Sequence, residues 1–192
     1  MYRQTILVLS LALAGVPALS GIAYAQANDA SNLSAEQLEE FFNKQKTRGL
    51  VLAPTNAQDN TGVGDTAATP SATQTYVELA PEEQVSIQIS FDFDSSALRA
   101  DQKPKLVTLC KVMQTADIGS FRIVGHTDSS GSASYNERLS LLRAQEVKRH
   151  LETDCGIEPE RLEAVGVGEA FLLDKADPDS DANRRVEFQA LS

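Results

Sequence analysis

An arginine and an aspartate have the residue types and the spacing to bind a charged ligand. In the helix predicted over residues 134–153, a period of about 100° per residue aligns four side chains: Asn136, Ser140, Arg143 and Val147. A guanidinium therefore lies in a stripe that would otherwise face the core. Arginine is rarely buried without a partner, and its planar guanidinium group can donate two parallel hydrogen bonds to a carboxylate. Asp128, at the end of the strand that leads into this helix, supplies a carboxylate.

Two interpretations of this pair are open. In the first, Asp128 and Arg143 form an internal ion pair that fixes the strand-to-helix turn. In the second, both groups face a cleft, where they bind the ammonium and the carboxylate of an amino-acid-like zwitterion. The residue types alone do not decide between the two.

Two other patterns imitate a catalytic site and a metal site. His126, Asp128 and Ser140 have the residue types of a hydrolase, but the sequence has no Gly-x-Ser-x-Gly elbow. Residues 177–188 have the acidic spacing of a calcium loop, but Ala182 stands at the position of its glycine and Phe188 at that of its last glutamate. We therefore predict no catalytic residue, no metal and no cofactor.

Composition limits the classes of partner. The chain has 192 residues, 42% of them hydrophobic, which suits one globular domain with appendages. Its 27 acidic and 17 basic residues give a formal net charge of -10. We expect no nucleic-acid partner, because this charge repels a polyanion.

The chain divides into four segments. A signal peptide is predicted over residues 1–25 from Arg3, the apolar run that follows it and the Ala23-Tyr24-Ala25 cleavage site. The apolar run has roughly 14 residues, which is too short for a transmembrane helix, since such a helix needs about 20. Residues 26–53 are predicted to hold a short helix that begins with a Ser34/Gln37 capping box. Residues 54–75 have the composition of a flexible linker, and residues 76–192 form the main domain.

The main domain alternates between strand and helix periods. Apolar residues recur at every second position over residues 85–93 and at helical spacing over residues 106–113. A strand over residues 121–125, the helix over residues 134–153 and strands over residues 162–167 and 185–191 follow. This order predicts an α+β fold, β-α-β-α-β-β, with helices packed on one face of a mixed sheet.

Cys110 and Cys155 are the two cysteines. In an exported protein they can form a disulfide, and closing a loop of about 45 residues would stabilise the fold by about 3–4 kcal/mol. Two buried free thiols are the alternative.

Three motifs resemble those of the OmpA-like C-terminal domain family. They are GHTDxxG at residues 125–131, NxxLSxxRA at residues 136–144 and NRRV at residues 183–186. The strand end FDFDS at residues 91–95 fits as well, so the resemblance covers roughly residues 84–191.

This resemblance implies non-covalent binding of peptidoglycan through the diaminopimelate of its stem peptide. The aspartate and arginine that hold the ammonium and carboxylate of that residue in family members match Asp128 and Arg143. The remaining groove positions of the family match four further residues, Phe91, Asp92, Thr127 and Asn136. Arg184 either lines the site or braces it. Residues 170–173, Ala-Phe-Leu-Leu, depart from the family's more polar stretch at the groove rim.

We therefore expect a non-enzymatic peptidoglycan-binding protein of the periplasm, with outer-membrane association as one arrangement. An alternative is an envelope scaffold that acts mainly through protein partners bound by residues 33–50. A cell-wall hydrolase is the third hypothesis.

Overall fold

A computed structural model describes residues 29–47, 76–92 and 95–191. The predicted signal peptide, residues 1–25, and the predicted linker, residues 54–75, lie outside the described residues.

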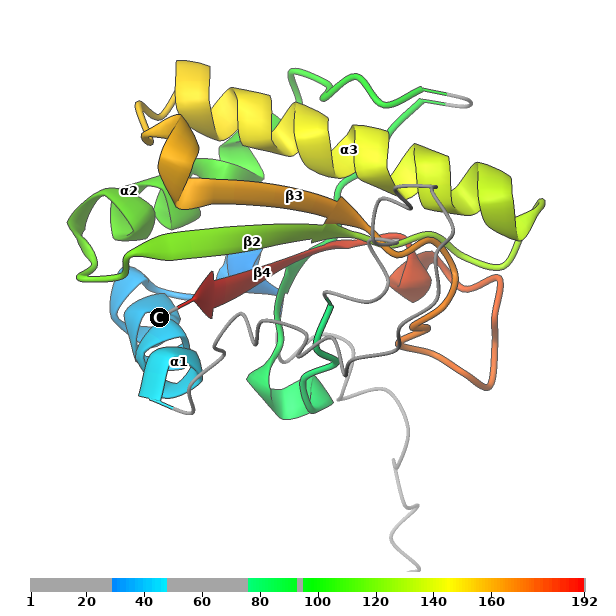
Figure 1. Ribbon diagram of the computed structural model, residues 1–192, viewed down its shortest axis with the longest axis horizontal. Helices are drawn as coiled ribbons and strands as arrows, with labels where there is room; N and C mark the ends of the chain where they lie inside the picture. The colour runs from blue at the N-terminus through cyan, green and yellow to red at the C-terminus, as the bar shows by residue number, and fades with distance from the viewer. Residues whose placement is uncertain (1–28, 48–75, 93–94, 192) are drawn as a thin grey trace, which may run out of the picture.

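A four-stranded mixed sheet forms the centre of the described fold (Figure 1). Its strands are β1 (Val85–Ile87), β2 (Ser120–Gly125), β3 (Leu162–Gly166) and β4 (Val186–Leu191), in the order β1-β4-β2-β3. β2 and β3 are parallel, whereas β4 is antiparallel to both β1 and β2. The predicted α+β class and the β-α-β-α-β-β order are confirmed.

Three α-helices accompany the sheet within the described residues: α1 (Ala35–Thr47), α2 (Val107–Thr115) and α3 (Ala133–Thr153). Ser132 caps α3, since its side chain accepts a hydrogen bond from the backbone N–H of Tyr135. Figure 1 shows α3 running along β3, over one face of the sheet. No helix in the described part of the chain is both long and apolar enough to cross a bilayer.

The first strand is shorter than its alternating pattern predicts. Val85, Ile87 and Ile89 are buried as expected, but the ladder with β4 ends at Ile87. Beyond that point side chains replace the ladder, since the Lys105 ammonium donates to the Gln88 carbonyl. The segment after β1 is therefore free to approach α3.

The sheet's two faces differ in chemistry. Alternate residues of β2 and β4 enter the main apolar core with α2 and α3; they are Phe121, Ile123, Val186, Phe188 and Ala190. This burial supplies most of the stability of the fold. On the other face lies a buried polar cluster around Glu187.

Four side chains surround the Glu187 carboxylate: Tyr76, Gln189, His126 and Arg185. Tyr76 Oη and Gln189 Nε2 each donate to it at 2.9 Å, and His126 Nε2 lies 3.2 Å away. Burial favours the neutral carboxyl, but hydrogen bonding to His126 and the charge of Arg185 outweigh it and lower the pKa of Glu187. Burial lowers the pKa of His126, which is therefore neutral near pH 7.

Helix α1 packs on the domain through its apolar side. The capping box forms, with Ser34 and Gln37 each accepting a backbone hydrogen bond of the other. Phe42 is fully buried with its ring 5.2 Å from that of Phe121. Gln45 accepts a hydrogen bond from the backbone N–H of Ala190, so α1 covers the edge of β4 that β1 leaves unpaired.

The predicted disulfide is present. Cys110 of α2 and Cys155, two residues after α3 ends, are bonded with their Cα atoms 5.6 Å apart. The bond links α2 to the segment that directly follows α3.

Candidate functional site

All seven predicted ligand-binding residues line one pocket of about 310 Å³: Phe91, Asp92, Thr127, Asp128, Asn136, Arg143 and Arg184. Four segments contribute them: the chain after β1, the turn between β2 and α3, the first half of α3, and the residue pair before β4. The pocket therefore lies where β2 ends and α3 begins.

Small residues bring α3 close enough to form this pocket. A Cβ atom on Gly125 would lie 2.0 Å from the Ser140 carbonyl oxygen, and one on Gly166 would lie 2.3 Å from the Leu141 nitrogen. Ser140 Oγ donates to the Glu137 carbonyl and accepts from the Gly168 N–H at 2.9 Å. The ends of β2 and β3 are thus fixed directly under the helix backbone.

Asn136 holds the turn that carries Asp128. Its side-chain amide donates to the carbonyls of Asp128 and Ser130 and, at 2.5 Å, to Glu169. Asn136 is 2% exposed. Asn136 therefore positions the turn, while its nitrogen is already occupied by protein acceptors. The Thr127 hydroxyl, also at the pocket, is buried and has no hydrogen-bond partner in the part of the chain that the structure describes.

Asp128 is paired with Arg184. Arg184 Nη1 lies 2.5 Å from Asp128 Oδ2, and the Ser130 N–H donates to Oδ1 at 3.0 Å. Arg184 also contacts the carboxylate of Asp181. Burial would raise the pKa of Asp128, but the hydrogen bonds from Arg184 and Ser130 outweigh it and lower that pKa.

Arg143 has no carboxylate within ion-pair distance among the described residues. Its guanidinium lies over the Phe91 ring, 4.7 Å from the centroid, and its Nε donates to the Ser95 carbonyl at 3.3 Å. Burial lowers the pKa of Arg143, yet an arginine remains charged at neutral pH. Phe91 and Ser95 therefore fix the plane of the guanidinium, while its Nη groups have no hydrogen-bond partner among the described residues.

The internal Asp128–Arg143 ion pair that the sequence left open is not formed. Asp128 takes its cation from Arg184, which is 56 residues away in the sequence. The pocket thus combines a partly neutralised carboxylate with a guanidinium that lacks a described carboxylate partner. This is the charge arrangement that a ligand with both an ammonium and a carboxylate requires.

Sequence reasoning missed part of this region. Ser130, Tyr135 and Leu139 also line the pocket. Tyr135 and Leu139 precede Arg143 by eight and four residues on α3, so the helical period was a usable signal. A neighbouring pocket of about 220 Å³ shares three residues with the first, Phe91, Arg143 and Arg184, and continues along residues 88–90 to Lys105 and Asp181.

The residues that resemble a hydrolase site and a calcium loop make other contacts in the structure. His126 contacts Glu187 on the face of the sheet opposite α3. Ser140 forms hydrogen bonds with Glu137 and Gly168 beneath α3, so His126 and Ser140 do not form a catalytic pair. In the acidic loop, Asp179 accepts from Ser129 and the Asn183 amide donates to three carbonyls of the loop itself.

A model of the OmpA family matches residues 90–185. The chain is a member of the OmpA family.

Three curated relatives show the range of proteins with this domain. Outer membrane protein A of Bordetella avium is 30% identical over 197 residues, which cover 100% of this chain and 98% of that protein. The peptidoglycan-associated lipoprotein of Brucella melitensis biotype 1 is 32% identical over 69% of this chain and 76% of its own length. Outer membrane porin F of Pseudomonas aeruginosa is 36% identical over 55% of this chain, but the match covers 31% of the porin. The chain thus spans about a third of the length of this longer relative.

Proposed function

We propose that this protein binds peptidoglycan non-covalently through the diaminopimelate of the stem peptide. In this proposal Arg143 receives the carboxylate of the diaminopimelate end and Asp128 receives its ammonium. The observation that carries it is the presence of both groups in one pocket, with Arg143 lacking a carboxylate partner among the described residues.

The surroundings of each group support these roles. Phe91 holds the guanidinium flat, which favours a carboxylate bound through two parallel hydrogen bonds. Arg184 and the Ser130 N–H keep Asp128 ionised and aimed, because each donates to a different carboxylate oxygen. Recognition then needs no catalytic step.

The names of the family relatives support peptidoglycan as the ligand. One of them is called a peptidoglycan-associated lipoprotein, and two others carry outer-membrane names. Charge-assisted hydrogen bonds contribute about 1.5–3 kcal/mol each before ordering costs, so a single site would bind at roughly micromolar to millimolar Kd. Weak sites suit a repeating mesh, since a released domain meets the next stem peptide at once.

We also propose an envelope location, with residues 1–25 acting as a signal peptide for export to the periplasm and residues 54–75 as a linker. A partner that binds residues 33–50 would use the exposed side of α1, because Leu38 and Phe42 are buried against the domain.

Co-sedimentation with insoluble, diaminopimelate-containing peptidoglycan tests this function. We expect the mature chain, residues 26–192, to pellet with the polymer, and we expect Arg143→Ala and Asp128→Asn each to weaken binding about tenfold or more. Arg138→Ala and Asp177→Asn are matched controls, since both residues are exposed and lie outside the pocket lining. Equal pelleting of all five proteins would refute the assignment, and release of soluble muropeptides would indicate a hydrolase instead.

A further inference from the structure

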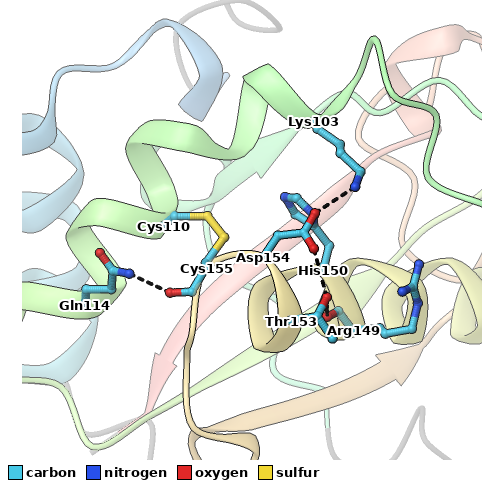
Figure 2. The surroundings of a disulfide bond; sticks show 8 residues. All are labelled: Lys103, Cys110, Gln114, Arg149, His150, Thr153, Asp154 and Cys155. Atoms are coloured by element: carbon cyan, nitrogen blue, oxygen red, sulfur yellow. Dashed lines mark hydrogen bonds and ion pairs between the residues drawn. A yellow bond between two sulfur atoms is a disulfide. The ribbon is translucent and has the colours of Figure 1, made fainter.

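A second cluster with ligand chemistry lies where α2 meets the end of α3, well apart in sequence from the Asp128 turn. Sulfur atoms of Cys110 and Cys155 and a ring nitrogen of His150 all lie within 4.8 Å of one another. They line a pocket of about 440 Å³ together with Lys103 and Asp154. Figure 2 shows His150 and Asp154 beside the disulfide.

His150 is oriented as a metal ligand would be. Its Nδ1 lies 2.8 Å from Asp154 Oδ2, and the same oxygen of Asp154 accepts from the Lys103 ammonium at 2.7 Å. Ligating histidines usually donate their other ring N–H to a carboxylate, which fixes the tautomer and leaves Nε2 for the metal. None of the residues of this cluster takes part in the proposed peptidoglycan site.

We propose that reduction of the Cys110–Cys155 disulfide converts this cluster into a three-ligand site for Zn²⁺. The ligands are the two thiolates and His150 Nε2, with Asp154 holding the histidine ring. Two sulfurs and one nitrogen suit Zn²⁺ and disfavour Ca²⁺ and Mg²⁺, which prefer oxygen ligands. Because the three ligands line the pocket, a water molecule from the pocket would complete the tetrahedron.

The conversion is chemically balanced when a dithiol is the reductant. The dithiol gives two electrons and two protons, its own sulfurs form a disulfide, and the Cys110–Cys155 bond becomes two thiols. Binding of Zn²⁺ then releases two protons from those thiols. Disulfide and zinc site are thus alternative states of the same two residues.

The geometry requires little movement of the backbone. Zn–S bonds of about 2.3 Å place two sulfurs about 3.8 Å apart in a tetrahedral site. The Cα atoms of Cys110 and Cys155, 5.6 Å apart, are already close enough for both sulfurs to reach one ion.

Titration of the reduced mature chain with Co²⁺ and Zn²⁺ tests the proposal. The protein is reduced with a phosphine, freed of reductant without oxygen, and titrated. We expect one Co²⁺ per chain with a thiolate-to-metal absorption band, displaced by one Zn²⁺, and no band in the oxidised protein. Cys110→Ser and His150→Ala should weaken Zn²⁺ binding at least tenfold, and Asp154→Asn about tenfold.

Glu152→Gln is the matched control, because it removes a carboxylate from the same helix without changing the cluster. We expect it to bind Zn²⁺ like the wild type. Should reduction unfold the chain, Zn²⁺ is expected to restore its helical circular dichroism. The proposal is overturned if the reduced chain gives no thiolate-to-metal band, if Zn²⁺ fails to refold an unfolded reduced chain, or if His150→Ala binds as tightly as the wild type.

Discussion

At the scale of single residues, the partners of Asp128 and Arg143 determine what the pocket can bind. Asp128 and its turn were predictable, because GHTD follows a strand directly. Its pairing with Arg184 was not, since the two are 56 residues apart and only the β4–β2 register brings them together. The contact of Arg143 with Phe91 was equally hidden, because it depends on where β1 leaves the sheet.

The lowered pKa of Asp128 leads to a prediction about pH. A carboxyl of ordinary pKa, about 4, begins to lose its charge near pH 5. In the folded protein the pKa of Asp128 is lowered. The Asp128 carboxylate, and any stability that its charge gives, is therefore fully present at a pH above the ordinary pKa of an aspartate. Both are lost only as the pH falls through the lowered pKa of the folded state. We expect peptidoglycan binding to be constant from pH 7 to 5 and to weaken below about pH 4. Co-sedimentation across this range measures it, and a loss between pH 7 and 5 would contradict this account of Asp128.

At the scale of elements, close packing of α3 on β2 positions the pocket. The sequence predicted both elements, but not that Gly125 and Gly166 lie against the helix backbone, because a glycine at a strand end also suits a simple turn. The premature end of β1 was likewise hidden, since alternation of apolar residues reports burial and not ladder length.

Gly125→Ala tests this packing. The added methyl would meet the Ser140 carbonyl, so α3 must shift, and we expect a loss of about 1–3 kcal/mol in the free energy of unfolding, together with weaker peptidoglycan binding. Gly119→Ala is the control, because a Cβ there has no atom within 4 Å, and its effect should be small. Urea unfolding provides the comparison. Equal stability of the two variants would show that the close approach is not a constraint.

At the scale of the whole molecule, helix α1, which precedes the main domain in the sequence, packs against it. The sequence predicted a short helix that begins with a Ser34/Gln37 capping box, but its position on the domain could not be derived, because nothing local encodes which sheet edge is left unpaired. In the structure, Gln45 hydrogen-bonds the free edge of β4, and Phe42 packs in the core beside Phe121.

We expect Phe42→Ala to lower the free energy of unfolding by about 3–5 kcal/mol, since it removes a fully buried ring. Phe41→Ala, which changes a partly buried neighbour, should cost clearly less. Chemical denaturation of both variants measures the difference. If the two lose the same stability, α1 does not pack on the domain through Phe42.

The recognition of a carboxylate by Arg143 is tested most directly by comparing two stem peptides. One contains diaminopimelate and the other contains lysine, which keeps the side-chain ammonium and lacks the second carboxylate. Isothermal titration calorimetry of the mature chain should give about a 10- to 100-fold lower Kd for the diaminopimelate peptide, and Arg143→Ala should remove most of this preference. Equal affinity of the wild type for both peptides would show that Arg143 does not recognise the second carboxylate.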